Sequence, residues 1–179
     1  MYCSNCGAAM SDTTCPACGR SLPVTARGRI DTVTGLMLAG WWRRVGATIA
    51  DSMILLIPIL FVVSLVDALD GALVGALAGL AVEGLYAVKL TSMPRGQTVG
   101  NRVAATRVRD ARTGRPLTLA QAAKRWGFIG AYSLIELVPT PAASYVLALC
   151  VLVDFLFPLV DPRNQTLHDK FAGVLMVLA

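Results

Sequence analysis

The sequence has few charged residues, because Asp, Glu, Lys and Arg make up only 15% of its 179 positions. Soluble domains average about 25% charged residues, and 55% of this chain is hydrophobic, which argues against a soluble globular protein. The net charge of +5 could suggest nucleic acid, but the positive-inside rule for membrane proteins accounts for it more simply. Composition therefore indicates a membrane protein, with the lipid bilayer rather than nucleic acid as its partner.

Sequence signatures of common catalytic sites are missing as well. The chain contains no P-loop, no dinucleotide fingerprint and no G-x-S-x-G motif. Its single histidine, His168, stands beside Asp169 without a nucleophile motif, so we interpret it as a structural hydrogen-bonding residue rather than half of a catalytic dyad. We therefore predict that the protein is not an enzyme, and we keep an enzyme acting on lipid or peptide as the weakest hypothesis.

The beginning of the chain lacks the apolar core of a cleavable signal peptide, since no apolar segment precedes Leu36. The first long apolar segment, residues 45–66, follows two tryptophans and two arginines at 41–44. About 20 apolar residues can cross a bilayer, and tryptophan and arginine suit the headgroup level on its cytoplasmic side. We expect this helix to act as both signal and anchor.

Three further apolar segments follow, at residues 72–90, 119–138 and 142–160. The middle one of these is continuously apolar only over residues 127–138, so three crossings are an alternative to four. The turns at 67–71 and 139–144 contain no Lys or Arg, so four crossings place all sixteen basic residues on one side. We therefore predict an all-α fold, a four-helix transmembrane bundle with both termini in the cytoplasm.

Four of the five cysteines lie in the first eighteen residues as two C-x2-C pairs: Cys3, Cys6, Cys15 and Cys18. Two such pairs can supply four thiolates to a tetrahedral zinc ion, and so small a module has almost no hydrophobic core without a metal. We predict a zinc ribbon at residues 1–19 with zinc as its cofactor. Two disulfides are the alternative, which a reducing cytosol disfavours.

The polar parts of the chain also show a pattern. Residues 20–38 mix Pro, Gly, Thr and Arg without periodicity and are predicted to be a linker, so the membrane domain covers residues 39–179. Residues 91–126 carry eight basic residues and predict a small cytosolic element, a short interfacial helix followed by a strand and turn. Thr118 is expected to cap the next helix. The apolar end of the chain is too short to span, so we expect it to pack as a strand beside this loop.

Glycines recur every four residues in the second span, at positions 71, 75 and 79, and Glu83 continues the series. Small residues at this spacing allow two membrane helices to approach closely. We therefore expect this face, including Glu83, to pack against another helix. A chance recurrence of common residue types is the alternative.

Three acidic residues lie within the predicted spans: Asp51, Glu83 and Asp154. At 1.5 Å per residue, each would lie about 9–11 Å below the cytoplasmic surface in the four-crossing arrangement. Acids in a membrane are expected to pair, here with Arg44, Lys89, Arg102 or a bound cation. We favour an ion-pair network that fixes the helices, and the alternative is a cation or proton site open to the cytosol.

Arg44 and Asp51 share one face of the first span, but they are separated by about 10 Å along the helix axis. We therefore expect each to meet a different segment of the chain. Asp51 should meet an arginine of the 95–115 loop, and Arg44 should meet an acid of the tail such as Asp169.

Three motifs in this order resemble the RDD family of bacterial membrane proteins. The first span with Arg44, Ala47 and Asp51 is similar to the family's opening motif. Residues 96–102, GQTVGNR, resemble its G-x-T-x-G-x-R loop, and residues 165–170, QTLHDK, resemble its closing T-x-H-D segment. The resemblance covers roughly residues 38–177.

The family name refers to an arginine and two aspartates, which the resemblance assigns to Arg44, Asp51 and Asp169, with Asp154 as the alternative second aspartate. The resemblance implies a location in the bacterial cytoplasmic (inner) membrane. The biochemical role of the family is largely unsettled, and cation transport has been suggested for some of its members.

These features together predict a multi-pass membrane protein with an interaction or regulatory role, in which the ribbon docks a protein partner. The alternative is a cation or proton transporter that uses the buried acids. No discontinuous helix pair or inverted repeat is evident, which argues against a self-contained transporter. A homo-oligomer is left open. The predicted charge network or ion site consists of Arg44, Asp51, Glu83, Asp154 and Asp169.

Overall fold

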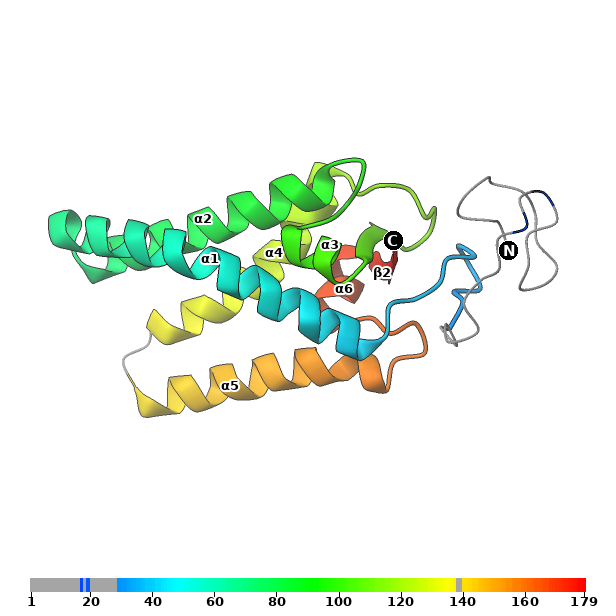
Figure 1. Cartoon of the computed structure of the whole chain (residues 1–179). Helices are drawn as coiled ribbons and strands as arrows, with labels where there is room; N and C mark the ends of the chain where they lie inside the picture. The colour runs from blue at the N-terminus through cyan, green and yellow to red at the C-terminus, as the bar shows by residue number, and fades with distance from the viewer. Residues whose placement is uncertain (1–16, 18, 20–28, 138–139) are drawn as a thin grey trace.

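A computed structural model describes residues 17, 19, 29–137 and 140–179 (Figure 1). The cysteines predicted to bind zinc lie outside these residues. The described chain is mostly helical, and its elements are α1 (Trp41–Asp70), α2 (Ala72–Ser92), α3 (Val99–Val103), β1 (Thr106–Asp110), α4 (Leu119–Ser133), η1 (Leu134–Leu137), α5 (Pro141–Leu156), η2 (Phe157–Leu159), α6 (Leu167–Ala172) and β2 (Val174–Leu178).

Three helical segments of the described chain are long and apolar enough to cross a membrane: Trp41–Val66, Leu73–Ser92 and Pro141–Leu159. The remaining predicted span is divided, because α4 has 15 residues and continues as the 3-10 helix η1. In Figure 1, the α1–α2 connection and the start of α5 lie toward the same end of the helices, and β2 lies toward the other end.

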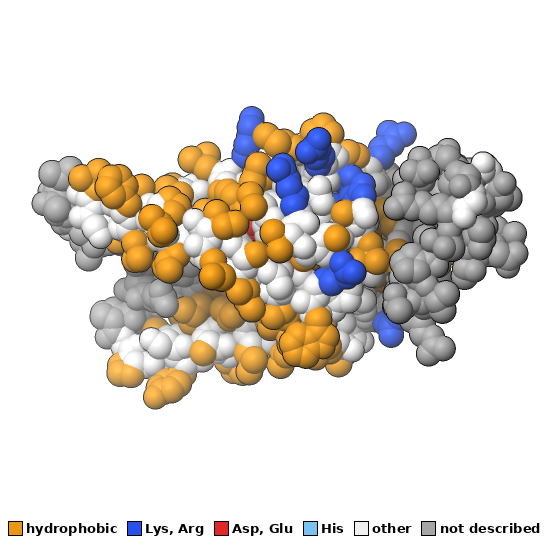
Figure 2. Space-filling model, viewed as in Figure 1, with side chains coloured by type: hydrophobic (Ala, Val, Ile, Leu, Met, Phe, Trp, Pro, Cys, Tyr) orange, Lys and Arg blue, Asp and Glu red, His pale blue; other side chains and the backbone are white. Residues whose placement is uncertain are grey.

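The long helices turn their apolar side chains outward. None of the residues in the most apolar 18-residue stretch of α1 is buried, and Ile57 on this helix is 76% exposed. Such a surface is typical of helices that face lipid. In Figure 2 hydrophobic side chains cover much of the visible face, and the Lys and Arg side chains lie in the half of the molecule away from the α1–α2 connection.

The close packing predicted for the glycine face of α2 is confirmed in part. A Cβ atom on Gly79 would lie 3.0 Å from a methyl group of Val63 and 3.4 Å from one of Ile59, so α1 passes directly over this glycine. Gly75 is also buried, whereas Gly71 is exposed at the start of α2. Small residues therefore allow the α1–α2 hairpin to close.

The end of the molecule opposite the α1–α2 connection is formed by residues 29–40, α3, β1, α6 and β2, which we call the cap. β1 and β2 pair as antiparallel strands, with Val108 opposite Met176, and Leu38 forms a bridge with Val177 on β2. The predicted strand at the end of the chain is thus confirmed. The described part of the predicted linker is hydrogen-bonded to this sheet, since Leu178 N donates to Met37 O at 2.8 Å.

The cap contains most of the buried apolar side chains. Alternate residues of β2 point to opposite faces. Val174 and Met176 pack with Val108 and Leu117 on one face, and Leu175 and Val177 pack with Leu38 and Ala111 on the other.

Threonines begin three of the helices that surround the cap. The side chains of Thr98, Thr118 and Thr166 accept hydrogen bonds from backbone N–H groups three residues later. Thr118 also forms a capping box with Gln121, which confirms its predicted role. These caps fix where α3, α4 and α6 start, and so position the charged residues that follow.

Candidate cation site

Asp169 is the centre of a buried ion-pair cluster. Its Oδ2 lies 2.6 Å from Arg44 Nη1 of α1, and its Oδ1 lies 2.8 Å from Arg125 Nε of α4. The Asp169 side chain is completely buried. Burial would raise the pKa of this carboxyl, but Arg125 and Arg44 outweigh burial and hold the pKa well below its usual range. The carboxylate is therefore ionised, and it ties α6 to α1 and α4.

Asp154 on α5 is bound by His168 of α6. The backbone N–H of His168 donates to Asp154 Oδ1 at 3.0 Å, and ring Nδ1 lies 2.6 Å from Oδ2. The second ring nitrogen, Nε2, is buried and makes no hydrogen bond to any described residue, although Asp169 Oδ1 lies 3.5 Å away. Asp154 therefore anchors the start of α6, a geometry that agrees with a structural role for His168.

Asp51 on α1 accepts hydrogen bonds from uncharged donors. Its Oδ1 accepts from the Tyr86 hydroxyl at 2.6 Å and from the Gly100 N–H at 2.7 Å, and its Oδ2 accepts from the Thr98 hydroxyl at 2.6 Å. The prediction that an arginine of the 95–115 loop pairs with Asp51 is wrong. The loop meets this carboxylate with a backbone amide and a threonine instead, because α3 begins directly beside α1.

Gly100 is what allows this close approach. A Cβ atom at this position would lie 2.1 Å from the carbonyl oxygen of Ala47 and 2.7 Å from Asp51 Cγ, so any side chain would push α3 away from α1. The other glycine of the loop, Gly96, has φ +62°, and its carbonyl accepts a hydrogen bond from Val108 N. The two glycines therefore join the loop to α1 and to the sheet.

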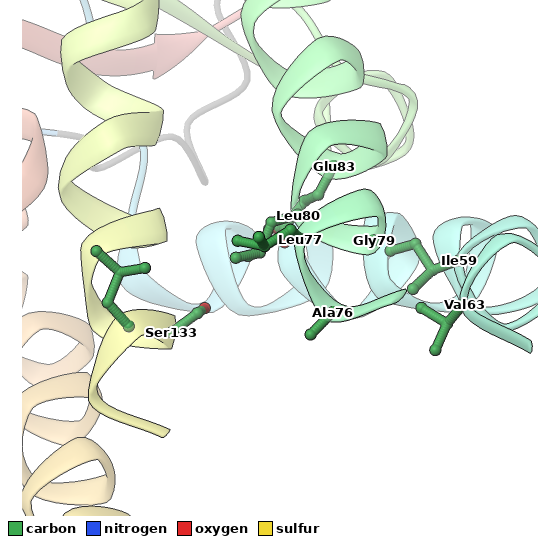
Figure 3. Close-up of a pocket in the computed structure, with 9 residues that line it drawn as sticks. Ile59, Val63, Ala76, Leu77, Gly79, Leu80, Glu83 and Ser133 are labelled. Atoms are coloured by element: carbon green, nitrogen blue, oxygen red, sulfur yellow. The ribbon is translucent and has the colours of Figure 1, made fainter. Parts of the chain in front are cut away.

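Two cavities lie between the helices. The first, about 470 Å³, is lined mainly by residues of α1, α2, α4 and α5, including all three predicted intramembrane acids, Asp51, Glu83 and Asp154. Arg125, which is paired with Asp169, and a few residues of the cap end, among them His168, complete its lining. The second, about 410 Å³, is lined mainly by apolar residues of α1, α2 and the α4–η1 junction, with Glu83 as its charged residue (Figure 3). Both cavities are lined by Ile59 and Glu83, so Glu83 lies at the boundary between them.

Glu83 differs from the other acids because none of the described residues forms a hydrogen bond or salt bridge with it. The expected pairing of the three cavity acids with Arg44, Lys89 or Arg102 is therefore wrong. Arg44 instead pairs with Asp169, which does not line the cavity, and this confirms the prediction that Arg44 meets an acid of the tail. The structure thus brings Asp51, Glu83 and Asp154 to one cavity, and of these three acids Glu83 alone receives no hydrogen bond from the part of the chain that the structure describes.

Several residues of this site were not identified from the sequence. Tyr86 donates a hydrogen bond to Asp51, and Arg125 donates one to Asp169. Trp126 lines the larger cavity, and its indole N–H is buried without a partner among the described residues. Arg125 was visible only as one of many basic residues. A signal for Tyr86 was its position three residues after Glu83, which places both on neighbouring turns of one helix face.

Comparison with known families gives one match, in which the model described as the RDD family covers residues 38–173. No curated protein sequence matches the chain. The matched region includes the cluster around Asp169, the Asp51 site and all residues that line the two cavities except Met176.

Proposed function

This chain belongs to the RDD family, and we propose that it is a membrane protein whose helices enclose a site for a cation or a proton and serve to transport it. The observation that carries this proposal is the cavity of about 470 Å³ to which Asp51, Glu83 and Asp154 all contribute. We prefer a cation or proton site to the structural ion-pair network favoured from the sequence, because such a network would pair all of its carboxylates, whereas Glu83 has no partner among the described residues.

Glu83 is the acid whose location among the helices costs most free energy. A carboxylate among membrane-spanning helices is costly unless it is paired, hydrogen-bonded or protonated. Asp51 and Asp154 receive hydrogen bonds from protein donors, whereas Glu83 receives none from the described residues. A bound cation or proton would supply the missing charge, and its exchange would allow Glu83 to alternate between two states.

The proposed topology has four crossings in the bacterial inner membrane, with the cap in the cytoplasm. It is supported by the location of basic residues toward the cap end (Figure 2) and by their absence from the α1–α2 turn. Cysteines introduced at Asp70 and Ser144, in a variant without the native cysteines, should react with a membrane-impermeant maleimide from outside the cell. Reaction of either site only after lysis would contradict four crossings.

The transport proposal is tested with purified protein in liposomes. Vesicles loaded with a pH dye and diluted to impose a pH gradient should lose the gradient faster when Na⁺, K⁺, Li⁺ or an organic cation is added outside. Glu83→Gln should reduce this flux to the level of empty liposomes, while Glu83→Asp, which keeps the charge, should retain part of it. If wild-type protein moves neither protons nor any of these cations, the transport proposal is wrong.

For residues 1–19 we propose a zinc ribbon that docks a protein partner, supported by the spacing of Cys3, Cys6, Cys15 and Cys18. Protein purified without chelator should contain about one zinc per chain, and Cys15→Ser should lose it. Metal-free protein with four reactive thiols would contradict the prediction. A partner that co-purifies with wild type but not with Cys15→Ser would support the regulatory role.

A further inference from the structure

We propose that the cavities on either side of Glu83 bind a lipophilic organic cation, with the Glu83 carboxylate as its counter-ion. The inference rests on the function proposed above and specifies the chemical class of its ligand. It follows from three properties of the cavities: which oxygen atoms are available, what lines the walls, and where the cavities open.

The available oxygen atoms do not suit a small metal cation. Ca²⁺ takes about six to eight oxygen ligands from carboxylates, carbonyls and water, and Mg²⁺ demands near-ideal octahedral oxygen geometry. In the cavity, the Asp51 oxygens already accept three hydrogen bonds and the Asp154 oxygens accept two. Among the described residues, no group of three His, Cys, Asp or Glu side chains could hold a metal. Glu83 alone cannot replace a hydration shell, but it can neutralise a large cation that holds its water weakly.

The walls around Glu83 suit the rest of such a ligand. Aliphatic side chains line the smaller cavity, among them Ile59 and Val63 of α1 and Leu80 of α2 (Figure 3). The larger cavity adds four aromatic rings, those of Tyr86, Trp126, Tyr132 and Phe155, and the positive charge of Arg125 in its lining is compensated by Asp169. Aromatic faces attract organic cations, and aliphatic walls bind their hydrocarbon groups. Volumes of about 410 and 470 Å³ lie in the range of sites for drug-sized molecules.

The cavities also reach the outer surface of the helices. Leu77 and Leu134 line the smaller cavity and are 46% and 51% exposed, and Leu56 and Leu60 line the larger one and are more than half exposed. In a bilayer these side chains would face lipid, so a ligand could enter sideways from the membrane. A lipophilic cation dissolves in a membrane, whereas a hydrated metal ion does not.

The test is direct binding of tetraphenylphosphonium to the full-length protein in lipid nanodiscs. Wild type should bind it, and Glu83→Gln should weaken binding at least tenfold while Glu83→Asp retains most of it. Because Glu83 has no partner among the described residues, its replacement leaves no group unpaired, and the variant is expected to fold. The neutral analogue triphenylphosphine oxide should bind much more weakly than the cation. Equal binding of the two probes, or unchanged binding by Glu83→Gln, would overturn the inference.

A pair of matched variants tests the location. Ala76→Phe adds a ring to the lining of the smaller cavity and should reduce binding several-fold, whereas Ala81→Phe adds the same ring to an exposed position of α2 outside both cavities and should not. Equal effects of the two would place the probe elsewhere. Absence of binding with Glu83-dependent Na⁺, K⁺ or Li⁺ flux would overturn this inference and leave the proposed function intact. Absence of both would overturn both.

Discussion

Three buried carboxylates in and beside the cap have cations next to them: Asp169 contacts two arginines, Asp161 contacts Lys170, and Asp31 contacts Arg163. A fourth, Asp110 on β1, accepts hydrogen bonds from the backbone of Arg112 and from Thr113 and Gln121. In the helical half, Asp51 is held by uncharged donors, and Glu83 has no donor among the described residues. The cap therefore compensates these buried charges within the protein, while Glu83 on α2 carries a charge that no described residue compensates and that a ligand could compensate. An uncompensated charge in a membrane helix usually has a function, so we place the ligand site at Glu83.

The cap and the membrane helices also differ in where their apolar side chains lie. Those of the cap are buried against one another on both faces of the small sheet, whereas those of α1 face outward. Burial from water stabilises the cap, but it does not hold helices together inside a lipid bilayer, where lipid tails are equally apolar. Close glycine contacts and carboxylate hydrogen bonds must hold the helices instead, and they leave room for cavities.

The largest expected effect comes from removing the central charge of the cap. Asp169→Asn leaves Arg44 and Arg125 buried without their carboxylate, which should cost about 3–5 kcal/mol of unfolding free energy. The measurement is the melting temperature in detergent or the denaturant midpoint. A loss below about 1 kcal/mol, the usual value for exposed ion pairs, would show that the cluster is hydrated. The cap would then not differ from the helices in how its buried charges are compensated.

The next effect concerns the contact between the cap and α1. Gly100→Ala places a Cβ atom against Ala47 O and Asp51 Cγ, and such overpacking should cost about 1–3 kcal/mol or more. Gly127→Ala is the matched control, because a Cβ atom there meets nothing within 4 Å, and alanine favours a helix by about 0.5–1 kcal/mol over glycine. Equal thermal stabilities of the two variants would contradict the close approach of α3 to α1.

Asp51→Asn tests whether the charge beside the cavity supports the fold. The neutral amide must turn its NH₂ toward one of three donors, from Tyr86, Thr98 and Gly100, and hydrogen bonds to a charged acceptor contribute about 1.5–3 kcal/mol each. We expect a loss of about 2 kcal/mol in thermal stability. A variant that is more stable but has lost cation flux would instead indicate that Asp51 belongs to the ion site.

The sequence predicted the helices and their ends better than their contacts. Apolar runs located α1, α2 and α5, and Thr118 located the start of α4, because these signals act within a few residues of the chain. The partner of Asp51 could not be predicted in this way. Helical spacing fixes the face and depth of a charge, but the residue opposite depends on how separate segments pack, and Gly100 brings a backbone N–H closer than any arginine.

A pH experiment measures a smaller effect in the cap. Burial raises the pKa of Asp31, but hydrogen bonds from Arg163 and Thr34 outweigh it and lower the pKa to about 2. A carboxyl whose pKa is lower in the folded than in the unfolded state stabilises the protein above the unfolded value, near 4, and this contribution disappears as pH falls toward 2. The melting temperatures of wild type and Asp31→Asn should therefore differ at pH 6 and converge between about pH 4 and 2. A difference in melting temperature that does not change with pH would mean that the negative charge of Asp31 does not contribute to stability.

The smallest expected effect on stability is that of Glu83→Gln, which tests whether the membrane helices differ from the cap. Glu83→Gln removes a charge that has no partner among the described residues, so it breaks no ion pair and no hydrogen bond that the structure contains. The variant should melt at the same temperature as wild type or higher, because a neutral amide costs less than a carboxylate among membrane helices. The measurement is a melting curve in detergent without added cation, with Asp169→Asn measured beside it. If Glu83→Gln loses as much stability as Asp169→Asn, Glu83 is part of a structural network like that of the cap, and it would no longer be available to bind a ligand.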